Sequence, residues 1–193
     1  MTLTRVARFT AIAALALALP FAVQAESNIT TGGGANITAT ARVNFSVVIP
    51  KFVFLQVGTG TLLTANATID TITFSLPAAS VGNSIAAAAT AGSGNLGNGG
   101  VTVRVIGNNG NMTLGATAGA NLISGTDTIP WTQVTTAITG GATHPTINGA
   151  NATFVAVNKV VNINGTWVYG YLNTVTPASG TYIGQVLYTA TTP

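Results

Sequence analysis

The chain has 193 residues, of which 47% are hydrophobic and only 5% are charged, and it contains no cysteine. This length suits one domain with a substantial core, and a chain without cysteine must fold without disulfides. Six basic and three acidic residues are too few for the basic clusters of nucleic-acid-binding proteins, so we expect no nucleic-acid partner.

The N-terminus has the features of a secretory signal peptide. Arg5 and Arg8 precede an apolar run over residues 9–22, and small residues lie at the end of the segment, at Val23 and Ala25. The run is shorter than the roughly 20 residues of a membrane-spanning helix. We therefore predict that residues 1–25 are removed and that no membrane span remains. We expect the protein to be secreted or displayed on the surface of a bacterial cell.

The remaining chain is nearly neutral. Four basic and three acidic side chains give residues 26–193 a net charge of +1. Charge repulsion between copies is therefore weak, and near-neutral surfaces favour association. We expect the protein to associate with itself.

Alternation of apolar and polar residues predicts several β-strands. The longest alternation covers Asn36–Val47, where one face collects apolar residues at every second position: Ile37, Ala39, Ala41, Val43, Phe45 and Val47. Further strands are expected at Lys51–Val57, Ile72–Leu76 and Val101–Val105. The alanine-rich run at Ser84–Ala91 is helix-compatible, but the glycines after it favour a loop.

Two hairpins are expected at Asn-Gly turns, because these residues reach positive φ at low cost. One hairpin places Asn164-Gly165 at its tip, and Trp167, Tyr169 and Tyr171 share a face of the returning strand. The other joins Val101–Ile106 to Met112–Thr117.

The last strand follows a turn at Pro177–Gly180. Tyr182, Gly184, Val186, Tyr188 and Ala190 would form one face, opposite Ile183, Gln185, Leu187 and Thr189. Apolar residues on both faces predict a strand inside a sheet that is covered on each side.

Short strands, many Asn and Gly turns and no helical periodicity indicate an all-β antiparallel sandwich or barrel. An outer-membrane barrel is the less favoured class, because only 7% of residues are aromatic and such barrels need aromatic girdles at both interfaces. We predict a sandwich over residues 36–193, preceded by a flexible segment at residues 26–35.

The C-terminal P-A-S-G-T-Y-I-G-Q-V-L-Y-T-A resembles the last strand of spore-coat-U-like proteins and of related pilin-like domains assembled by the chaperone–usher route. The early A-T-A-R-V-N-F-S-V-V-I-P-K-F-V-F-L-Q-V-G-T-G is similar to their opening strands, although the chain lacks the cysteines that some of these families use. The resemblance implies an Ig-like, pilin-like sandwich and a fimbrial or filament subunit. It also implies a periplasmic chaperone and outer-membrane assembly machinery as partners.

In such pilins each sandwich lacks a strand, which an N-terminal extension of the neighbour supplies by β-strand addition. The segment Glu26–Thr40, with Gly32–Gly34 as a hinge, could donate that strand. Alternatively, Asn36–Val47 is the first strand of the chain's own sheet and residues 26–35 are a frayed tail, as termini often are.

The residues needed for catalysis are scarce, so we expect a protein that is not an enzyme and that binds no cofactor or metal. His144 is the single histidine, in a loop where a solvated side chain is expected, and the acids Asp70 and Asp127 are far apart in sequence. No serine lies in a nucleophile elbow for a Ser–His–Asp triad. Zinc and calcium sites need ligand clusters that this sequence does not contain.

The alternative function is that of an exported monomeric adhesin or carbohydrate-binding module. Aromatic rings provide stacking surfaces for glycans or a host surface. Trp131, which follows Pro130 in an irregular segment, is the candidate ligand-binding residue. Aromatic residues on alternating strand positions are more often part of the core.

Overall fold

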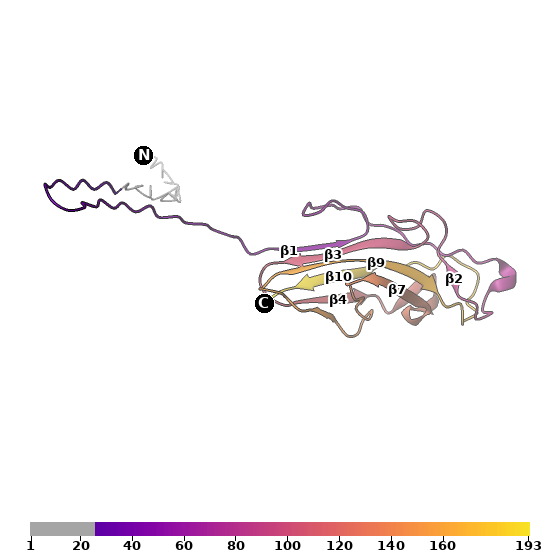
Figure 1. Ribbon diagram of the computed structural model, residues 1–193. Helices are drawn as coiled ribbons and strands as arrows, with labels where there is room; N and C mark the ends of the chain where they lie inside the picture. The colour runs from indigo at the N-terminus through magenta and orange to yellow at the C-terminus, as the bar shows by residue number, and fades with distance from the viewer. Residues whose placement is uncertain (1–25) are drawn as a thin grey trace, which may run out of the picture. The chain divides into compact units, whose positions relative to one another are not determined.

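The computed structural model describes residues 26–193, so the predicted signal peptide at residues 1–25 lies outside the described residues. The chain divides into an N-terminal unit that ends at Val48 and a compact unit, called the body here, over Ile49–Pro193. Within residues 26–52 no strand is formed, so the first strand begins at Val53 and the sandwich does not begin at Asn36 as expected (Figure 1).

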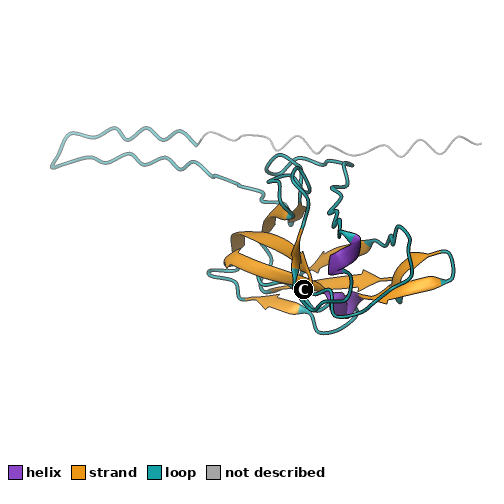
Figure 2. Cartoon of the chain, turned by 90° about the vertical axis from the view of Figure 1, so that its right-hand side faces the viewer, coloured by secondary structure: helices purple, strands orange, loops and turns teal. Residues whose placement is uncertain are grey.

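The body is all-β and antiparallel, which confirms the predicted fold class (Figure 2). Within the described residues, its only helical elements are two 3₁₀ turns, η1 (Ala78–Ser80) and η2 (Trp131–Gln133). The strands are β1 (Val53–Val57), β2 (Ala87–Ala88), β3 (Gly100–Gly107), β4 (Met112–Ala118), β5 (Asn121–Ser124), β6 (Asp127–Pro130), β7 (Val134–Gly140), β8 (Ala152–Phe154), β9 (Val161–Tyr171) and β10 (Val186–Thr191).

The strands form two sheets and a separate hairpin. In the first sheet β1 pairs with β3, β3 pairs with β9, and β7 pairs with the other side of β9; the short β2 pairs with the end of β9 beyond β3. The second sheet has the order β10-β4-β8. The hairpin of β5 and β6 stands apart from both.

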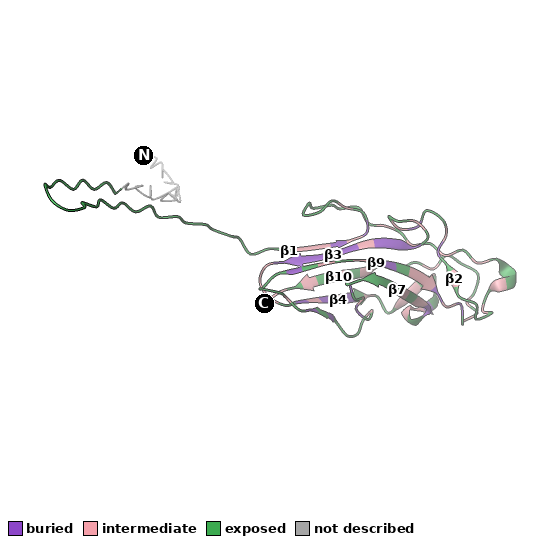
Figure 3. Ribbon diagram, viewed as in Figure 1, coloured by how far each residue is buried: buried purple, intermediate pink, exposed green. Residues whose placement is uncertain are grey.

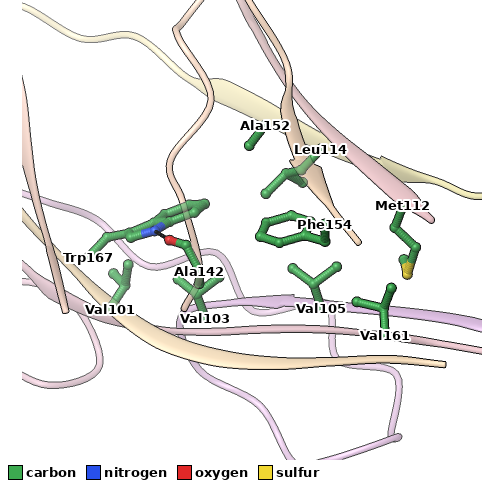
Figure 4. Close-up of a cluster of buried hydrophobic side chains, with 10 residues drawn as sticks. All are labelled: Val101, Val103, Val105, Met112, Leu114, Ala142, Ala152, Phe154, Val161 and Trp167. Carbon is green, nitrogen blue, oxygen red and sulfur yellow. Dashed lines mark hydrogen bonds between the residues drawn. The ribbon is translucent and has the colours of Figure 1, made fainter. Parts of the chain in front are cut away.

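The core lies between the two sheets (Figure 4). Alternate residues of β3 and β9 face alternate residues of β4 and β8, because successive side chains of a strand point to opposite faces. The buried cluster comprises Val101, Val103, Val105, Met112, Leu114, Ala142, Ala152, Phe154, Val161 and Trp167. Trp167 is fully buried, and its indole N–H donates to the carbonyl of Ala142 at 2.6 Å.

Neither predicted hairpin forms. Strand β9 runs straight through Asn164-Gly165, because β3 pairs with it on one side and β7 on the other, and these ladders leave no room for a turn. The loop between β3 and β4 joins different sheets, so these two strands do not pair with each other. The predicted shared face of Trp167, Tyr169 and Tyr171 is nevertheless correct, since Trp167 and Tyr171 are buried and Tyr169 packs against the core.

Two other strand predictions need correction. The Ile72–Leu76 segment alternates in burial as expected but is not a strand; its neighbour at Thr90–Gly94 makes only scattered backbone hydrogen bonds to it. Strand β10 begins at Val186 and is an edge strand that pairs with β4 alone. Its outward face is open, with Leu187 66% exposed, so it is not covered on both sides.

Candidate functional site

The N-terminal segment from Glu26 to Val48 is an unpaired chain with a strand-like sequence. All its residues are exposed and none lies in a β-ladder (Figure 3). The apolar face predicted for Asn36–Val47 is therefore in water: Phe45 is 90% exposed, Val47 82% and Val43 71%. The alternative in which this segment is the first strand of the chain's own sheet is not what the structure contains.

The segment doubles back on itself around Gly32–Gly34 (Figure 1). Arg42 donates to the carboxylate of Glu26 at 2.7 and 3.1 Å, and the Thr30 hydroxyl donates to the carbonyl of Thr38 at 3.0 Å. The hydrogen bond from Arg42 lowers the pKa of Glu26. Because the ion pair is fully exposed, water and salt screen it and it holds the segment only weakly.

Both sheets of the body have unpaired strand edges, and those of β1 and β10 are the two considered as acceptors. Among the described residues, β1 pairs only with β3, β10 pairs only with β4, and no backbone hydrogen bond joins β1 to β10. The side chain of Lys51 and that of Asn109 both donate to the carbonyl of Pro193, so the start of β1 lies near the end of β10. Unpaired edges present free N–H and C=O groups that can accept a further strand.

The core is less well covered at these edges than at its centre. Val103 and Val105 on β3 are 0% exposed, whereas the inward-facing residues of β1 and β10 are only partly buried: Leu55, Val57, Val186, Tyr188 and Ala190. Val53, at the start of β1, is 41% exposed. A further strand along these edges would bury apolar surface as well as satisfy backbone groups.

His144 is not the solvated loop residue that the sequence suggested. Its Nε2 lies 2.9 Å from the Tyr188 hydroxyl, which in turn lies 2.8 Å from the Tyr169 hydroxyl, and its ring packs edge-on against Trp167 at 4.5 Å. Burial lowers the pKa of His144, and it raises the pKa values of Tyr169 and Tyr188. All three side chains are therefore neutral near pH 7. The alternation of β10 predicts an inward Tyr188, but nothing in the sequence predicts its contact with a distant loop.

The two acids of the body lie in a loop and at the start of a strand. The Asp70 carboxylate accepts hydrogen bonds from the backbone N–H and the hydroxyl of Thr59, which ties two loop segments together. Asp127 begins β6. Within residues 26–193, no hydrogen bond or ion pair links either acid to His144, and no group of three His, Cys, Asp or Glu residues could hold a metal ion.

Trp131 lies in η2 and lines a hollow of about 300 Å³. The other lining residues come from η2, from the inward face of β7 and from the loop at residues 144–147: Thr132, Val134, Thr136, Ile138, His144, Pro145, Thr146 and Ile147. The indole N–H of Trp131 donates to the carbonyl of Gly119 at 2.7 Å. Gln133, at the end of the same turn, is buried and bonded to Thr174 through both its amide nitrogen and its amide oxygen.

Comparisons with models of protein families, with curated proteins and with solved structures gave no match. Over residues 26–193 the structure has no helix that is long and apolar enough to cross a membrane.

Proposed function

We propose that the protein is a non-catalytic structural subunit of an exported surface filament, and that copies join by β-strand addition. The observation that carries the proposal is the exposed alternation of Asn36–Val47, which has the pattern of a half-buried strand but no sheet of its own. A segment of this kind gains both backbone hydrogen bonds and apolar contacts when it pairs with a sheet edge.

The acceptor in this proposal is the edge pair of β1 and β10 on a neighbouring copy. Both edges lack a partner, and the apolar residues behind them are half-covered. The donor in this proposal is Asn36–Val47, which lies later in the chain than the stretch Glu26–Thr40 that the sequence suggested, because the sustained alternation of apolar residues continues there through Val43, Phe45 and Val47. Residues 48–52 connect the donor to β1 of its own body, and residues 26–35, with three successive glycines, precede the donor and take no part in the pairing.

Export by the signal peptide, delivery by a periplasmic chaperone and passage through outer-membrane machinery belong to the same proposal. A chaperone is required on physical grounds, since an exposed apolar alternation and an open strand edge on every copy favour uncontrolled aggregation. The low charge of the chain adds to that risk.

The test compares two substitutions one residue apart in the chain that begins at Glu26. Phe45→Asp places a charge on the apolar face of the donor, and Asn44→Asp places the same charge on the polar face. We expect Phe45→Asp to reduce polymers, measured by light scattering and electron microscopy, at least roughly tenfold, because the charge would be buried at the acceptor edge. Asn44→Asp should polymerise like the original chain.

A peptide assay tests whether the segment pairs with the body at all, while the polymer measurement shows whether it does so between copies. A synthetic peptide of residues 36–47 should bind to the monomeric Phe45→Asp protein, whose own donor is disabled, and raise its unfolding temperature. The same peptide with Phe45→Asp should not bind. Equal polymerisation of both protein variants, or equal binding of both peptides, would overturn the proposal.

A further inference from the structure

The proposed strand addition at β1 and β10 does not involve the hollow beside Trp131. It lies at β7, the opposite edge of the first sheet from β1. No Asp, Glu, Lys or Arg lines it, and its one titratable side chain, His144, is neutral near pH 7 because burial lowers its pKa. An ionised ligand would find no counter-charge here, so the site suits a neutral molecule.

The lining combines apolar surface with available hydroxyl groups. Trp131, Val134 and Ile138 supply the apolar part. The hydroxyls of Thr132, Thr136 and Thr146 make no hydrogen bond to any described residue, so each can donate and accept one to a ligand. Pyranose sugars have the complementary character, since they present C–H faces that stack on aromatic rings and a rim of hydroxyls.

The aromatic wall is fixed before any ligand arrives. The hydrogen bond from Trp131 to Gly119 sets the indole, and its ring edge packs so closely on Gly184 that a Cβ there would lie 2.7 Å from Cζ2. The hydrogen bond between His144 Nε2 and the Tyr188 hydroxyl fixes the imidazole ring. A wall that does not reorganise loses little entropy on binding, which favours even a shallow site.

From these observations we propose that the hollow lined by Trp131, Thr136 and His144 binds a neutral sugar, one or two pyranose rings in size. The volume of about 300 Å³ lies at the lower limit of small-molecule pockets, which restricts the ligand to this size. This inference does not depend on polymerisation, because the hollow belongs to a single body.

The experiment titrates the monomeric Phe45→Asp protein with glucose, galactose, mannose, N-acetylglucosamine and their β-1,4-linked disaccharides, followed by ¹⁵N–¹H NMR. N-acetylneuraminic acid, which is charged, serves as the comparison. We expect saturable shifts of the amides of Thr132, Thr136 and Ile147 with at least one neutral sugar and none with the acid.

Matched variants test the residues. Thr136→Val removes one hydroxyl at constant shape and should weaken binding roughly three- to tenfold, since one hydrogen bond is lost. Thr135→Val, on the opposite face of β7, should leave the affinity unchanged. Trp131→Ala should abolish binding. If Trp131→Ala does not fold, the affinity of Thr136→Val tests the proposal in its place. The absence of saturable shifts with every neutral sugar, or equal affinity of Thr136→Val and Thr135→Val, would overturn the proposal.

Discussion

Trp167 shows how much of the fold depends on single residues. It is 0% exposed at the centre of the core, and its N–H donates a hydrogen bond to the buried carbonyl of Ala142 (Figure 4). We expect Trp167→Phe to lower the free energy of unfolding by about 2–4 kcal/mol, because a smaller ring leaves a void and the carbonyl loses its donor.

Urea unfolding followed by circular dichroism measures this loss. Val168→Ala is the matched control, since Val168 is the next residue of β9, points to the opposite face and is 41% exposed. It should cost less than about 1 kcal/mol. Similar losses in the two variants would contradict the assignment of the core face.

At the scale of elements, β9 is the strand on which the first sheet depends. Gly165 lies in its middle, where a Cβ would lie 2.8 Å from the Cβ of Ala142 and 2.8 Å from the carbonyl oxygen of Thr139. Gly165→Ala should therefore destabilise the protein by about 1–3 kcal/mol, since both neighbours belong to well-packed segments.

Gly119→Ala provides the comparison, because nothing lies within 4 Å of a Cβ at that exposed position. Its effect on the urea midpoint should be close to zero or slightly stabilising. If Gly165 were at a hairpin tip, as its sequence context suggests, the two alanine variants would behave alike.

The strands also show what the sequence can and cannot predict. Alternation gives the inward faces of β3, β9 and β10 correctly, because side-chain direction is a local property of an extended chain. Pairing is not local: Asn164-Gly165 is a turn signal that two flanking ladders override, and Ile72–Leu76 has a strand pattern without a ladder. The same limit applies to the hollow, whose walls come from η2, β7 and the His144 loop.

At the scale of the whole molecule, the scarcity of ionisable groups makes stability depend on pH in an unusual way. His144 is the only histidine, and burial lowers its pKa from the ordinary value of about 6.5. The folded state thus binds fewer protons than the unfolded state below that pH. The tyrosines that face it, Tyr169 and Tyr188, stay neutral because their pKa values are raised.

The free energy of unfolding should therefore be constant between about pH 6.5 and pH 9, below the titration of tyrosine, and should fall as the pH decreases from 6.5 toward the lowered pKa of His144. Carboxylates titrate mainly below about pH 5, so the window between is clear of them. In His144→Gln the slope between pH 5 and 6.5 should disappear. A slope of the same size in the variant, measured by urea unfolding, would contradict this explanation.

The two tryptophans of the chain lie in contrasting environments, one fully buried in the core and one half-exposed at the hollow. Their fluorescence should therefore separate into a blue-shifted component from Trp167 and a red-shifted component from Trp131. With Trp131→Phe the emission reports only the integrity of the core, and the difference from the original chain reports the hollow. The protein thus contains a built-in pair of optical probes, one for folding and one for ligand occupancy.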